Sequence, residues 1–169
     1  MPSAATKFLA QADQPLATLA KELAGAPSPR DVAWILCEFT GRQLDLVDAV
    51  VYLLDADGAL SQQAAWGPKR AADHVLESRI RLQPGQGIVG TCAEQQRSLR
   101  MSDARDDPRY IQDDQSNRSE LAVPIVAGDV LFGVLDSEHP EPGFYTADHE
   151  RAMLMLAQCG AARLLALGN

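Results

Sequence analysis

The stretch Pro84-Gly-Gln-Gly-Ile-Val-Gly90 decides between two folds. It has the G-x-G-x-x-G spacing of a dinucleotide-binding βαβ unit, and Asp103 follows at about the expected distance. Such a unit, however, needs a helix long enough to cross over to a parallel strand. Residues 91–97 leave room for only about two helical turns before the next strand-like segment. The stretch therefore predicts a tight turn before a short helix over 88–95, with glycines that permit positive φ.

Strand-like segments flank this turn on both sides, at 48–54, 59–66, 79–83, 99–102, 121–126 and 130–135. Asp55-Ala-Asp-Gly58 joins the first two segments into a predicted hairpin, and Gly128-Asp129 joins the last two. Pro124 predicts an edge position or a bulge, because proline cannot donate a hydrogen bond to a neighbouring strand. Two hairpins around a mixed middle predict antiparallel pairing.

Helices are expected near both ends of the chain. Ser28 can cap a helix over 29–43, and Asp31 completes a capping box. Thr146 can cap a second helix over 147–167. This order predicts an α+β fold in which an antiparallel sheet carries the terminal helices on one face. Apolar residues cover more than one face of 147–167, which predicts contact with another helix or another subunit.

Residues 1–27 predict an N-terminal helical arm or linker ahead of a domain at 28–169. A stripe of apolar residues steps by three and four, as on one face of a helix, and consists of Leu9, Ala12, Leu16, Leu19 and Leu23. Pro15 should break or restart such a helix, so 15–24 is the predicted helical part.

Composition excludes several classes of function. The 169 residues, of which 46% are hydrophobic and 22% charged, are typical of one globular domain. The net charge is −8 and no Lys/Arg cluster is present, so neither nucleic acid nor an anionic membrane is an expected partner. The first residues lack the apolar run of a signal peptide, and no stretch reaches the ~18 apolar residues that span a bilayer. We expect a cytoplasmic protein.

No metal and no cofactor are expected from the residue pattern. The cysteines Cys37, Cys92 and Cys159 are scattered without a CxxC pair, and the histidines do not form a ligand set. The turn at 55–58 resembles the start of a calcium loop, but its twelfth position is Trp66 instead of glutamate. For nucleophilic catalysis Cys92 is the candidate, at a helix start that could lower its pKa; the alternative is a buried, inert thiol.

A polar segment without periodicity occupies 103–117. Loops longer than about 12 residues in compact domains are usually functional or disordered. Three interpretations remain open for it: a solvated loop with local Asp–Arg pairs, a metal site built from its carboxylates, and a lid over a small-molecule pocket. Tyr110 and Ile111 favour the lid because they supply apolar anchors.

Five motifs in this chain resemble those of GAF domains, in family order and at family spacing, from about residue 28 to residue 167. They are Pro84-Gly-Gln-Gly-Ile-Val-Gly90, Asp103-Ala-Arg-Asp-Asp-Pro-Arg-Tyr110, Arg118-Ser-Glu-Leu-Ala-Val-Pro124, Phe132-Gly-Val-Leu-Asp136 and Phe144-x-Thr146-x-x-His149. GAF domains are sensory modules. The resemblance implies a six-stranded antiparallel sheet with terminal helices on one face and a ligand pocket under loops on the other.

The same resemblance implies partners. GAF domains commonly dimerise through their terminal helices, so a homodimer through helices 15–43 and 147–167 is expected. Ligand binding would then shift the population of helix arrangements. The chain would act on a separate signalling partner, or belong to a longer signalling protein of the bacterial two-component type.

The resemblance also bears on ligand and catalysis. The N-K-F-D-E motif of cyclic-nucleotide GAF domains and the Cys-His pair of bilin-binding ones are absent. The enzymatic branch, free methionine-(R)-sulfoxide reductase, has cysteines where this chain has Val89 and Asp113. A carboxylate cannot attack sulfur as a thiolate does, so a non-catalytic sensor is implied. The alternatives are a diverged reductase that uses Cys92, and a ligand-free dimerisation module.

Acidic residues mark the expected ligand site. The carboxylates that surround the substrate in the reductase branch match Glu120, Asp136 and Glu138. A small cationic or zwitterionic ligand, such as an amino acid, would neutralise them, because unpaired buried charge is costly. The full expected set is Tyr110, Ile111, Asp113, Asp114, Ser119, Glu120, Asp136 and Glu138. In the alternative interpretation Glu120 pairs with a nearby arginine or caps loop amides.

The acidity of the chain is concentrated in two segments. Residues 103–120 hold six acidic and three basic side chains, and residues 136–150 hold five acidic ones and no lysine or arginine. Together they account for the whole net charge of −8. Because both segments belong to the expected site or border it, the pattern predicts a pocket rim that favours cations.

Overall fold

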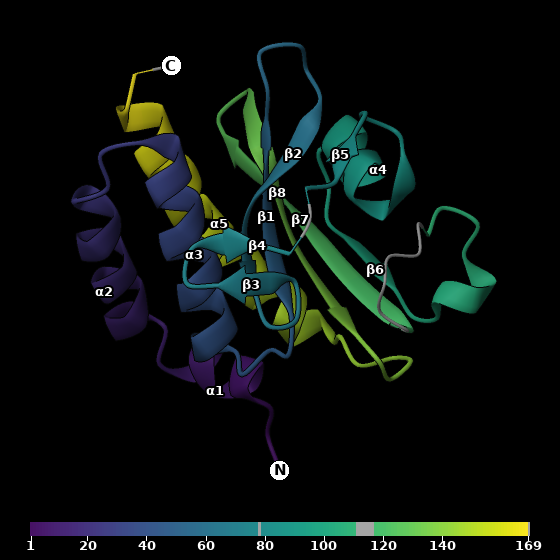
Figure 1. The fold of residues 1–169 in the computed structure, drawn as a ribbon. Coiled ribbons are helices and arrows are strands. Elements are labelled where there is room, and N and C mark those ends of the chain that lie inside the picture. The colour runs from purple at the N-terminus through teal and green to yellow at the C-terminus, as the bar shows by residue number, and fades with distance from the viewer. Residues whose placement is uncertain (78, 111–116, 169) are drawn as a thin grey trace.

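The computed structural model describes residues 1–77, 79–110 and 117–168 (Figure 1). Within these residues one sheet has the strand order β5-β2-β1-β8-β7-β6, and all neighbouring strands are antiparallel. Its strands are β1 Ala49–Leu54, β2 Leu60–Trp66, β5 Arg81–Leu82, β6 Leu99–Met101, β7 Ser119–Ala127 and β8 Val130–His139. A separate small hairpin pairs β3 Arg70–Ala72 with β4 Val75–Leu76. The predicted α+β fold with a six-stranded antiparallel sheet is confirmed.

Helices lie on both faces of the sheet. They are α1 Ala4–Ala10, α2 Asp13–Ala24, α3 Pro29–Gln43, α4 Gly87–Gln95 and α5 Ala147–Ala166, with a short 3-10 helix, η1, at Ala104–Asp106. The terminal helices α3 and α5 pack on one face, and α1 and α2 cover them from outside (Figure 1). The opposite face is covered by α4 (Figure 1). In the described part of the chain, the second face is thus covered by the short helix α4 and by loops.

The two long terminal helices begin where the sequence predicts. The Ser28 side chain accepts a hydrogen bond of 3.2 Å from the backbone N–H of Asp31, and Pro29 occupies the first turn. Thr146 and His149 form a reciprocal capping box at the start of α5. Burial lowers the pKa of His149, so the neutral ring accepts the cap hydrogen bond from the Thr146 N–H.

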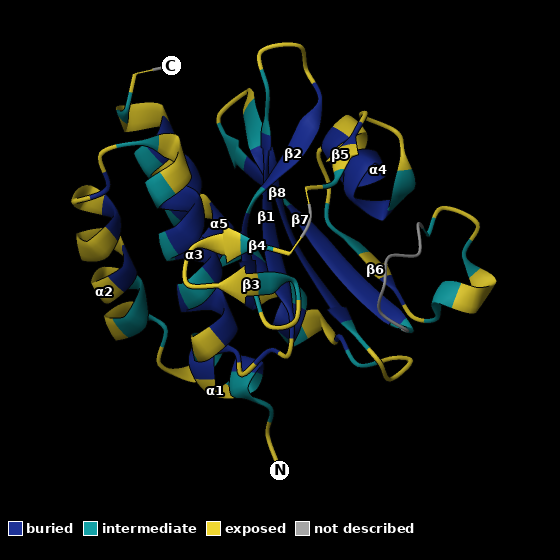
Figure 2. Ribbon diagram, viewed as in Figure 1, coloured by how far each residue is buried: buried dark blue, intermediate teal, exposed yellow. Residues whose placement is uncertain are grey.

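Alternation along the strands separates two apolar layers. In β1, Ala49, Val51 and Leu53 face the terminal helices. Val50 and Tyr52 face the other side, where they join the layer under α4. Successive side chains of a strand point to opposite faces, so one buried strand supplies both layers. Figure 2 shows β1, β7 and β8 buried over most of their length.

The wide apolar surface of α5 is covered within the chain. One side of α5 packs on β7 and β8, and the other side packs on α1, α2 and α3. Of the two alternatives that the sequence left open, another helix therefore accounts for the second apolar face. Homodimerisation through the terminal helices stays a prediction.

The glycine-rich stretch forms the predicted turn. Gly85 and Gly87 have φ of 88° and 69°, a region that favours glycine. A Cβ on Gly90 would lie 2.4 Å from the carbonyl oxygen of Gln83, so only glycine fits there. After α4 the chain enters β6, which pairs antiparallel with β7. The glycines shape a turn and do not belong to a βαβ unit.

The N-terminal arm differs in detail from the sequence prediction, whereas Pro124 agrees with it. The arm forms α1 and α2, and the break between them lies at 11–12 instead of at Pro15. Pro15 sits in the first turn of α2, where a backbone N–H has no partner within the helix in any case. Pro124 lies beyond the part of β7 that pairs with β6, next to a register shift, so the predicted edge or bulge is confirmed. Among the described residues, no helix combines the length and the apolar character needed to cross a membrane.

Candidate ligand-binding site

A small cavity of about 30 Å³ lies on the sheet face under α4. Its walls come from β1, β5, β7, β8, the first turn of α4 and the segments around 69 and 80, and the lining residues are Tyr52, Lys69, Ile80, Leu82, Gly87, Ile88, Val89, Glu120, Asp136 and Glu138. A volume of this size holds about one or two water molecules. An amino acid would therefore enter only after lining side chains have moved.

The three carboxylates expected from the sequence meet at this cavity. Glu120 on β7 lies opposite Glu138 on β8, and Asp136 lies opposite Ala122 of β7. Their exposed fractions are only 5%, 4% and 2% for Glu120, Glu138 and Asp136. Period-two alternation explains this meeting, because residues two apart on a strand share a face and paired residues stand side by side.

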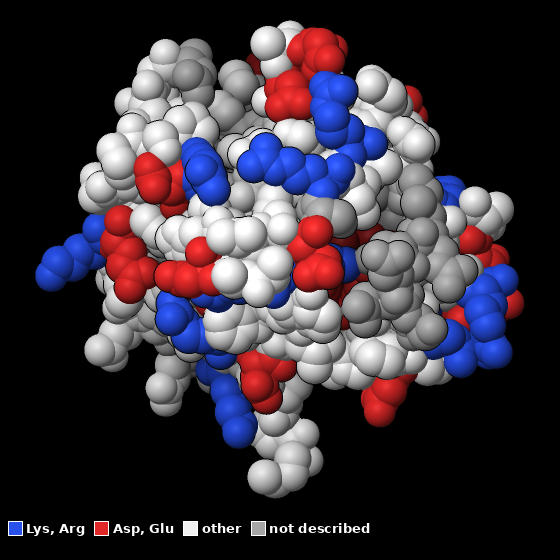
Figure 3. All heavy atoms as spheres, in the orientation of Figure 1, with Lys and Arg blue, Asp and Glu red and all other residues white. Residues whose placement is uncertain are grey.

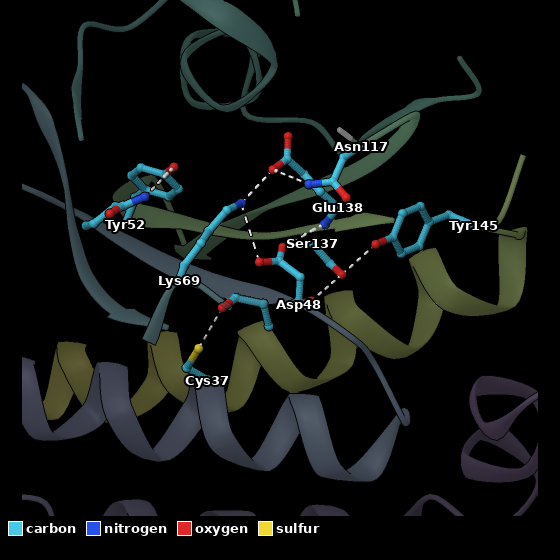
Figure 4. A network of polar contacts seen from close by, with 10 residues as sticks. Cys37, Asp48, Tyr52, Lys69, Asn117, Ser137, Glu138 and Tyr145 are labelled. Carbon is cyan, nitrogen blue, oxygen red and sulfur yellow. Dashed lines mark hydrogen bonds and ion pairs between the residues drawn. The ribbon is translucent and has the colours of Figure 1, made fainter. Parts of the chain in front are cut away.

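Two further charged residues complete the cluster, and the sequence analysis missed both. Asp48, just before β1, accepts a hydrogen bond of 2.9 Å from the backbone N–H of Glu138. The ammonium group of Lys69 lies 2.5 Å from Oε2 of Glu138 and 3.4 Å from Oδ1 of Asp48 (Figure 4). Asn117 contributes a longer amide contact of 3.4 Å to Glu138. We call Asp48, Glu120, Asp136 and Glu138 the carboxylate cluster.

Lys69 is held as an ammonium ion. Burial alone would lower its pKa, but the charges of Asp48, Glu138 and Asp136 raise the pKa well above its ordinary value. The Lys69 side chain is 12% exposed and those of Asp48 and Glu138 are 5% exposed. The pair is thus largely removed from water, where charge pairs interact more strongly and where losing one partner is costly.

Glu120 carries the opposite perturbation. Burial raises its pKa well above the ordinary value, and the charge of Asp136 and a hydrogen bond with Asp136 raise it further. Two carboxyl groups in contact share a proton more readily than both ionise. The raised pKa favours the protonated form of Glu120 beside Asp136, next to the ion pairs of Lys69.

Replacing Glu120 with glutamine is expected to stabilise the protein at neutral and alkaline pH. The raised pKa of Glu120 means that its favourable contribution is fully present below the unfolded-state pKa of about 4.3 and is lost as pH rises through the folded-state pKa. Urea unfolding of wild type and Glu120→Gln from about pH 4 to about pH 8 should show a stability difference that grows with pH. Glu22→Gln, on the exposed surface of α2, controls for the charge change. A difference that is constant over this range would contradict a proton held at Glu120.

The other expected site residues are placed differently. Ser119 does not lie with Glu120: its hydroxyl donates a hydrogen bond of 2.6 Å to the carbonyl of Glu141 on the opposite side of β7. Tyr110 is half-buried and packs on the apolar layer under α4. Ile111, Asp113 and Asp114 lie outside the described residues.

The acidic segment before the site is largely paired at the surface. Arg118 donates two hydrogen bonds to Asp103, of 3.0 and 2.6 Å, and Arg109 donates two to Asp107. The arginine lowers the pKa of each of these aspartates. Local Asp–Arg pairing, one of the three interpretations of this segment, therefore applies to its described part. Figure 3 shows acidic and basic side chains intermixed over this face of the molecule, with acidic atoms also visible in a hollow near its centre.

Two buried thiols, Cys37 and Cys92, have raised pKa values. Cys92 on α4 is fully buried, and burial together with the charge of Asp136 raises its pKa. Cys37 donates to the carbonyl of Ala49, and burial raises its pKa as well. A thiol that is protonated at neutral pH is a poor nucleophile. Cys92 is the sixth residue of α4 and lies beyond the helix start, and its pKa is raised, whereas one of the two alternatives above expected a lowered pKa.

In the described part of the chain, one group of side chains has its potential metal-ligand atoms close enough together to hold a metal ion. Ligand atoms of Glu38, Asp73 and His74 lie within 4.8 Å of one another. Arg70, however, pairs with both carboxylates of this group. Both carboxylates are thus already paired with a guanidinium, and the printed contacts of the group form an ion-pair network.

The fold and this cavity define a class: an α+β domain whose helices cover one sheet face while the other face holds a buried, charged cavity. The family model of the GAF domain matches residues 29–164. The chain therefore belongs to the GAF domain family. A search among curated proteins finds no match.

Solved structures agree with this fold. A protein described as a GAF sensor from Burkholderia vietnamiensis is 22% identical, with a TM-score of 0.77 over 98% of each chain. The GAF domain of a phosphoenolpyruvate-protein phosphotransferase from Coxiella burnetii is 20% identical, with a TM-score of 0.76 over 90% of this chain and 92% of that one. Free methionine-R-sulfoxide reductase from Neisseria meningitidis, in complex with its substrate, is 19% identical, with a TM-score of 0.75 over 89% and 86%. At these identities the likeness establishes the fold alone.

Proposed function

We propose that this chain is a non-catalytic sensory GAF domain that binds a small molecule through an ammonium group. The ligand is cationic or zwitterionic, with an amino acid as the nearest chemical type. The observation that carries the proposal is the carboxylate cluster: four buried acidic groups stand around one lysine. Buried carboxylates that exceed their cations in number favour an incoming positive charge.

The sheet offers a direct path from the site to the terminal helices. Glu120 and Asp136 point into the cavity, while their neighbours Leu121 and Leu135 point into the layer shared with the helices. α5 packs on both β7 and β8. Tight packing transmits small strand displacements, because close-packed interiors yield little. We propose that the chain forms a homodimer in which ligand binding biases the arrangement of α3 and α5. A separate cytoplasmic signalling partner then binds according to that arrangement.

The lack of catalysis is part of the proposal. Cys92 is buried with a raised pKa, and Val89 stands where the reductase branch has one of its cysteines. A thiolate is required to attack the sulfur of a sulfoxide. Wild type and Cys92→Ser are both expected to leave methionine sulfoxide unconsumed in a thiol-coupled assay. Consumption by wild type that is lost in Cys92→Ser would instead support a diverged reductase.

Calorimetric titration tests the ligand class. Wild type, Glu120→Gln and the surface control Glu22→Gln are titrated with the amino acids and with polyamines. Wild type and Glu22→Gln should bind a member of the panel, and Glu120→Gln should bind it at least roughly tenfold more weakly, since a hydrogen bond to a charged group contributes ~1.5–3 kcal/mol. If wild type binds none of these compounds, the ammonium site is excluded.

The volume of the cavity favours a second candidate function. About 30 Å³ is less than any amino acid requires, and Lys69 already lies in the cluster. A ligand-free GAF domain used only to dimerise would have a filled site of this kind. Absence of binding in the titration, together with a dimer mass in sedimentation equilibrium, would support this candidate over the sensor.

A further inference from the structure

The β3–β4 hairpin and the residue before it contact both the cavity and helix α3. It follows β2 directly, and the backbone N–H of Glu77 closes it with a hydrogen bond of 2.8 Å to the carbonyl of Lys69. Lys69 and Arg70 are consecutive, but their side chains reach to different layers of the molecule. The hairpin is therefore a single short segment with one contact in the candidate site and another on a terminal helix.

On the cavity side, Lys69 lines the site as a primary ammonium on a four-carbon chain. Its Nζ contacts Glu138 and Asp48 in the carboxylate cluster. The chain contains only three lysines, and the other two, Lys7 and Lys21, are exposed on α1 and α2. Lys69 thus supplies to the cluster the same chemical group that an amine ligand would bring.

On the helix side, the next residues attach the hairpin to α3. The guanidinium of Arg70 lies 3.1 Å from Oε2 of Glu38, and its centre is 5.9 Å from the centroid of the Trp34 ring. His74 stacks on Trp34 with a centroid distance of 4.5 Å, and its Nε2 lies 3.0 Å from Oε1 of Glu38. Both side chains converge on the same two residues of α3.

We propose that the β3–β4 hairpin is a displaceable strap: Lys69 fills the carboxylate cluster when no ligand is bound, and a primary ammonium ligand replaces it and loosens the hairpin from α3. This inference rests on the proposed function, because it concerns the same site. It identifies Lys69 as a group that competes with the ligand, and the hairpin as the segment that couples the site to α3. The ligand class becomes narrower than a general cation, since the cluster is arranged around a primary ammonium.

Space and chain geometry support the exchange. The cavity of about 30 Å³ does not hold a second ammonium group with its carbon chain beside Lys69, so the two exclude each other. Consecutive Cα atoms are only about 3.8 Å apart, so a backbone shift that accompanies withdrawal of Lys69 reaches Arg70 directly. The contacts that Arg70 and His74 make with Glu38 and Trp34 of α3 then change together. A ligand shifts such an equilibrium by its differential affinity for the two arrangements.

Chemical rescue tests the strap. Lys69→Ala is titrated with n-butylammonium, which matches the lysine side chain, and its thermal stability and amide hydrogen exchange are followed. Tetramethylammonium, which cannot donate hydrogen bonds, is the control cation, and wild type and Lys21→Ala are the control proteins. We expect n-butylammonium to raise the Tm of Lys69→Ala more than that of either control protein. Exchange protection in 70–77 and in α3 near Glu38 should be lower in Lys69→Ala than in wild type. It should stay low after this addition, because the free amine fills the cluster without being attached to the hairpin, while α2 stays unchanged.

The outcomes separate this inference from the proposed function. If wild type and Lys69→Ala bind n-butylammonium equally well, the site accepts amines but Lys69 is no competitor, and the strap is excluded while the proposed function stands. If Lys69→Ala is rescued while wild type binds no amine or amino acid, the occupancy by Lys69 stands and the sensor function fails. Protection in 70–77 and α3 that is equal in Lys69→Ala and wild type would overturn the coupling of the Lys69 contact to that helix. If Lys69→Ala does not fold, the exchange experiment on wild type with 1,4-diaminobutane decides: unchanged protection of 70–77 at saturation, or no binding, excludes the strap.

Discussion

Lys69→Met is expected to destabilise the protein by ~3–5 kcal/mol at neutral pH, the usual cost of removing one partner from a buried ion pair. Methionine keeps the unbranched stem and removes the charge, so Asp48 and Glu138 lose the ammonium that faces them. For a chain of this size the loss corresponds to a fall in Tm of roughly 10 °C. Urea unfolding and a thermal melt, followed by circular dichroism, measure both quantities.

The pH dependence of this effect has a definite sign. The pKa of Lys69 is raised on folding, so its contribution is fully present below the unfolded-state value of about 10.4 and is lost only as pH rises through the folded-state pKa. The difference between wild type and Lys69→Met should therefore persist from neutral pH to about pH 9. Lys21→Met, at an exposed position of α2, is the matched control and should change the free energy of unfolding very little.

A double variant identifies the cause. Lys69→Met combined with Glu138→Gln removes one of the two negative charges that face the Lys69 ammonium, and the glutamine keeps the shape. We expect the double variant to recover part of the lost stability, because replacing both members of a buried pair costs less than removing one. A loss of less than about 1 kcal/mol in Lys69→Met would show that the pair behaves like one at the surface.

The features that the sequence predicts correctly depend on neighbouring residues. Ser28 and Thr146 cap helices with groups three residues away, and the turn at 85–90 depends on positions where only glycine fits. These rules act within a few residues, so one segment contains the whole signal. The β1–β2 and β7–β8 hairpins were predictable for the same reason, since their turn residues are adjacent in the chain, whereas the β3–β4 hairpin was not predicted.

The features that the sequence leaves undetermined are contacts between distant segments. Lys69 lies 69 positions from Glu138, and the β3 stretch Arg70–Ala72 has neither apolar alternation nor a turn motif that indicates its place. The position of Asp48 gives a weak indication that it belongs to the site. It lies an even number of residues before Val50 and Tyr52, which face the cavity side, and residues two apart on a strand share a face. The same rule argues against Ser119, which is adjacent to Glu120 and therefore points to the other face. Strand parity could thus have refined the candidate site, whereas the Lys69 contacts required the fold.

Gly133→Ala is expected to abolish folding or to cost at least about 3 kcal/mol, at the upper end of single-substitution effects. Gly133 lies in β8 opposite Leu53 of β1, in the middle of the sheet. A Cβ at this position would lie 1.9 Å from the carbonyl oxygen of Tyr52 and 3.0 Å from the Cα of Leu53. These are backbone atoms of a paired central strand, so no side-chain rotation relieves the overlap, and β1 and β8 must separate.

Separation of these strands would also reach the candidate site. Tyr52 and Asp136 line the cavity from β1 and β8. The pairing of Val50 with Asp136 fixes the position of Tyr52 relative to Asp136 along the two strands. Gly25→Ala is the control, because Gly25 has a helical φ of −85° and its nearest neighbour to an added Cβ is 3.6 Å away. That variant should match wild type or gain up to about 1 kcal/mol from reduced freedom of the unfolded chain. Chemical unfolding of the two variants side by side measures the contrast. A Gly133→Ala protein as stable as Gly25→Ala would mean that β1 and β8 can move apart at this point without loss of stability. The position of Asp136 in the cavity would then not depend on the close approach of Gly133 to β1.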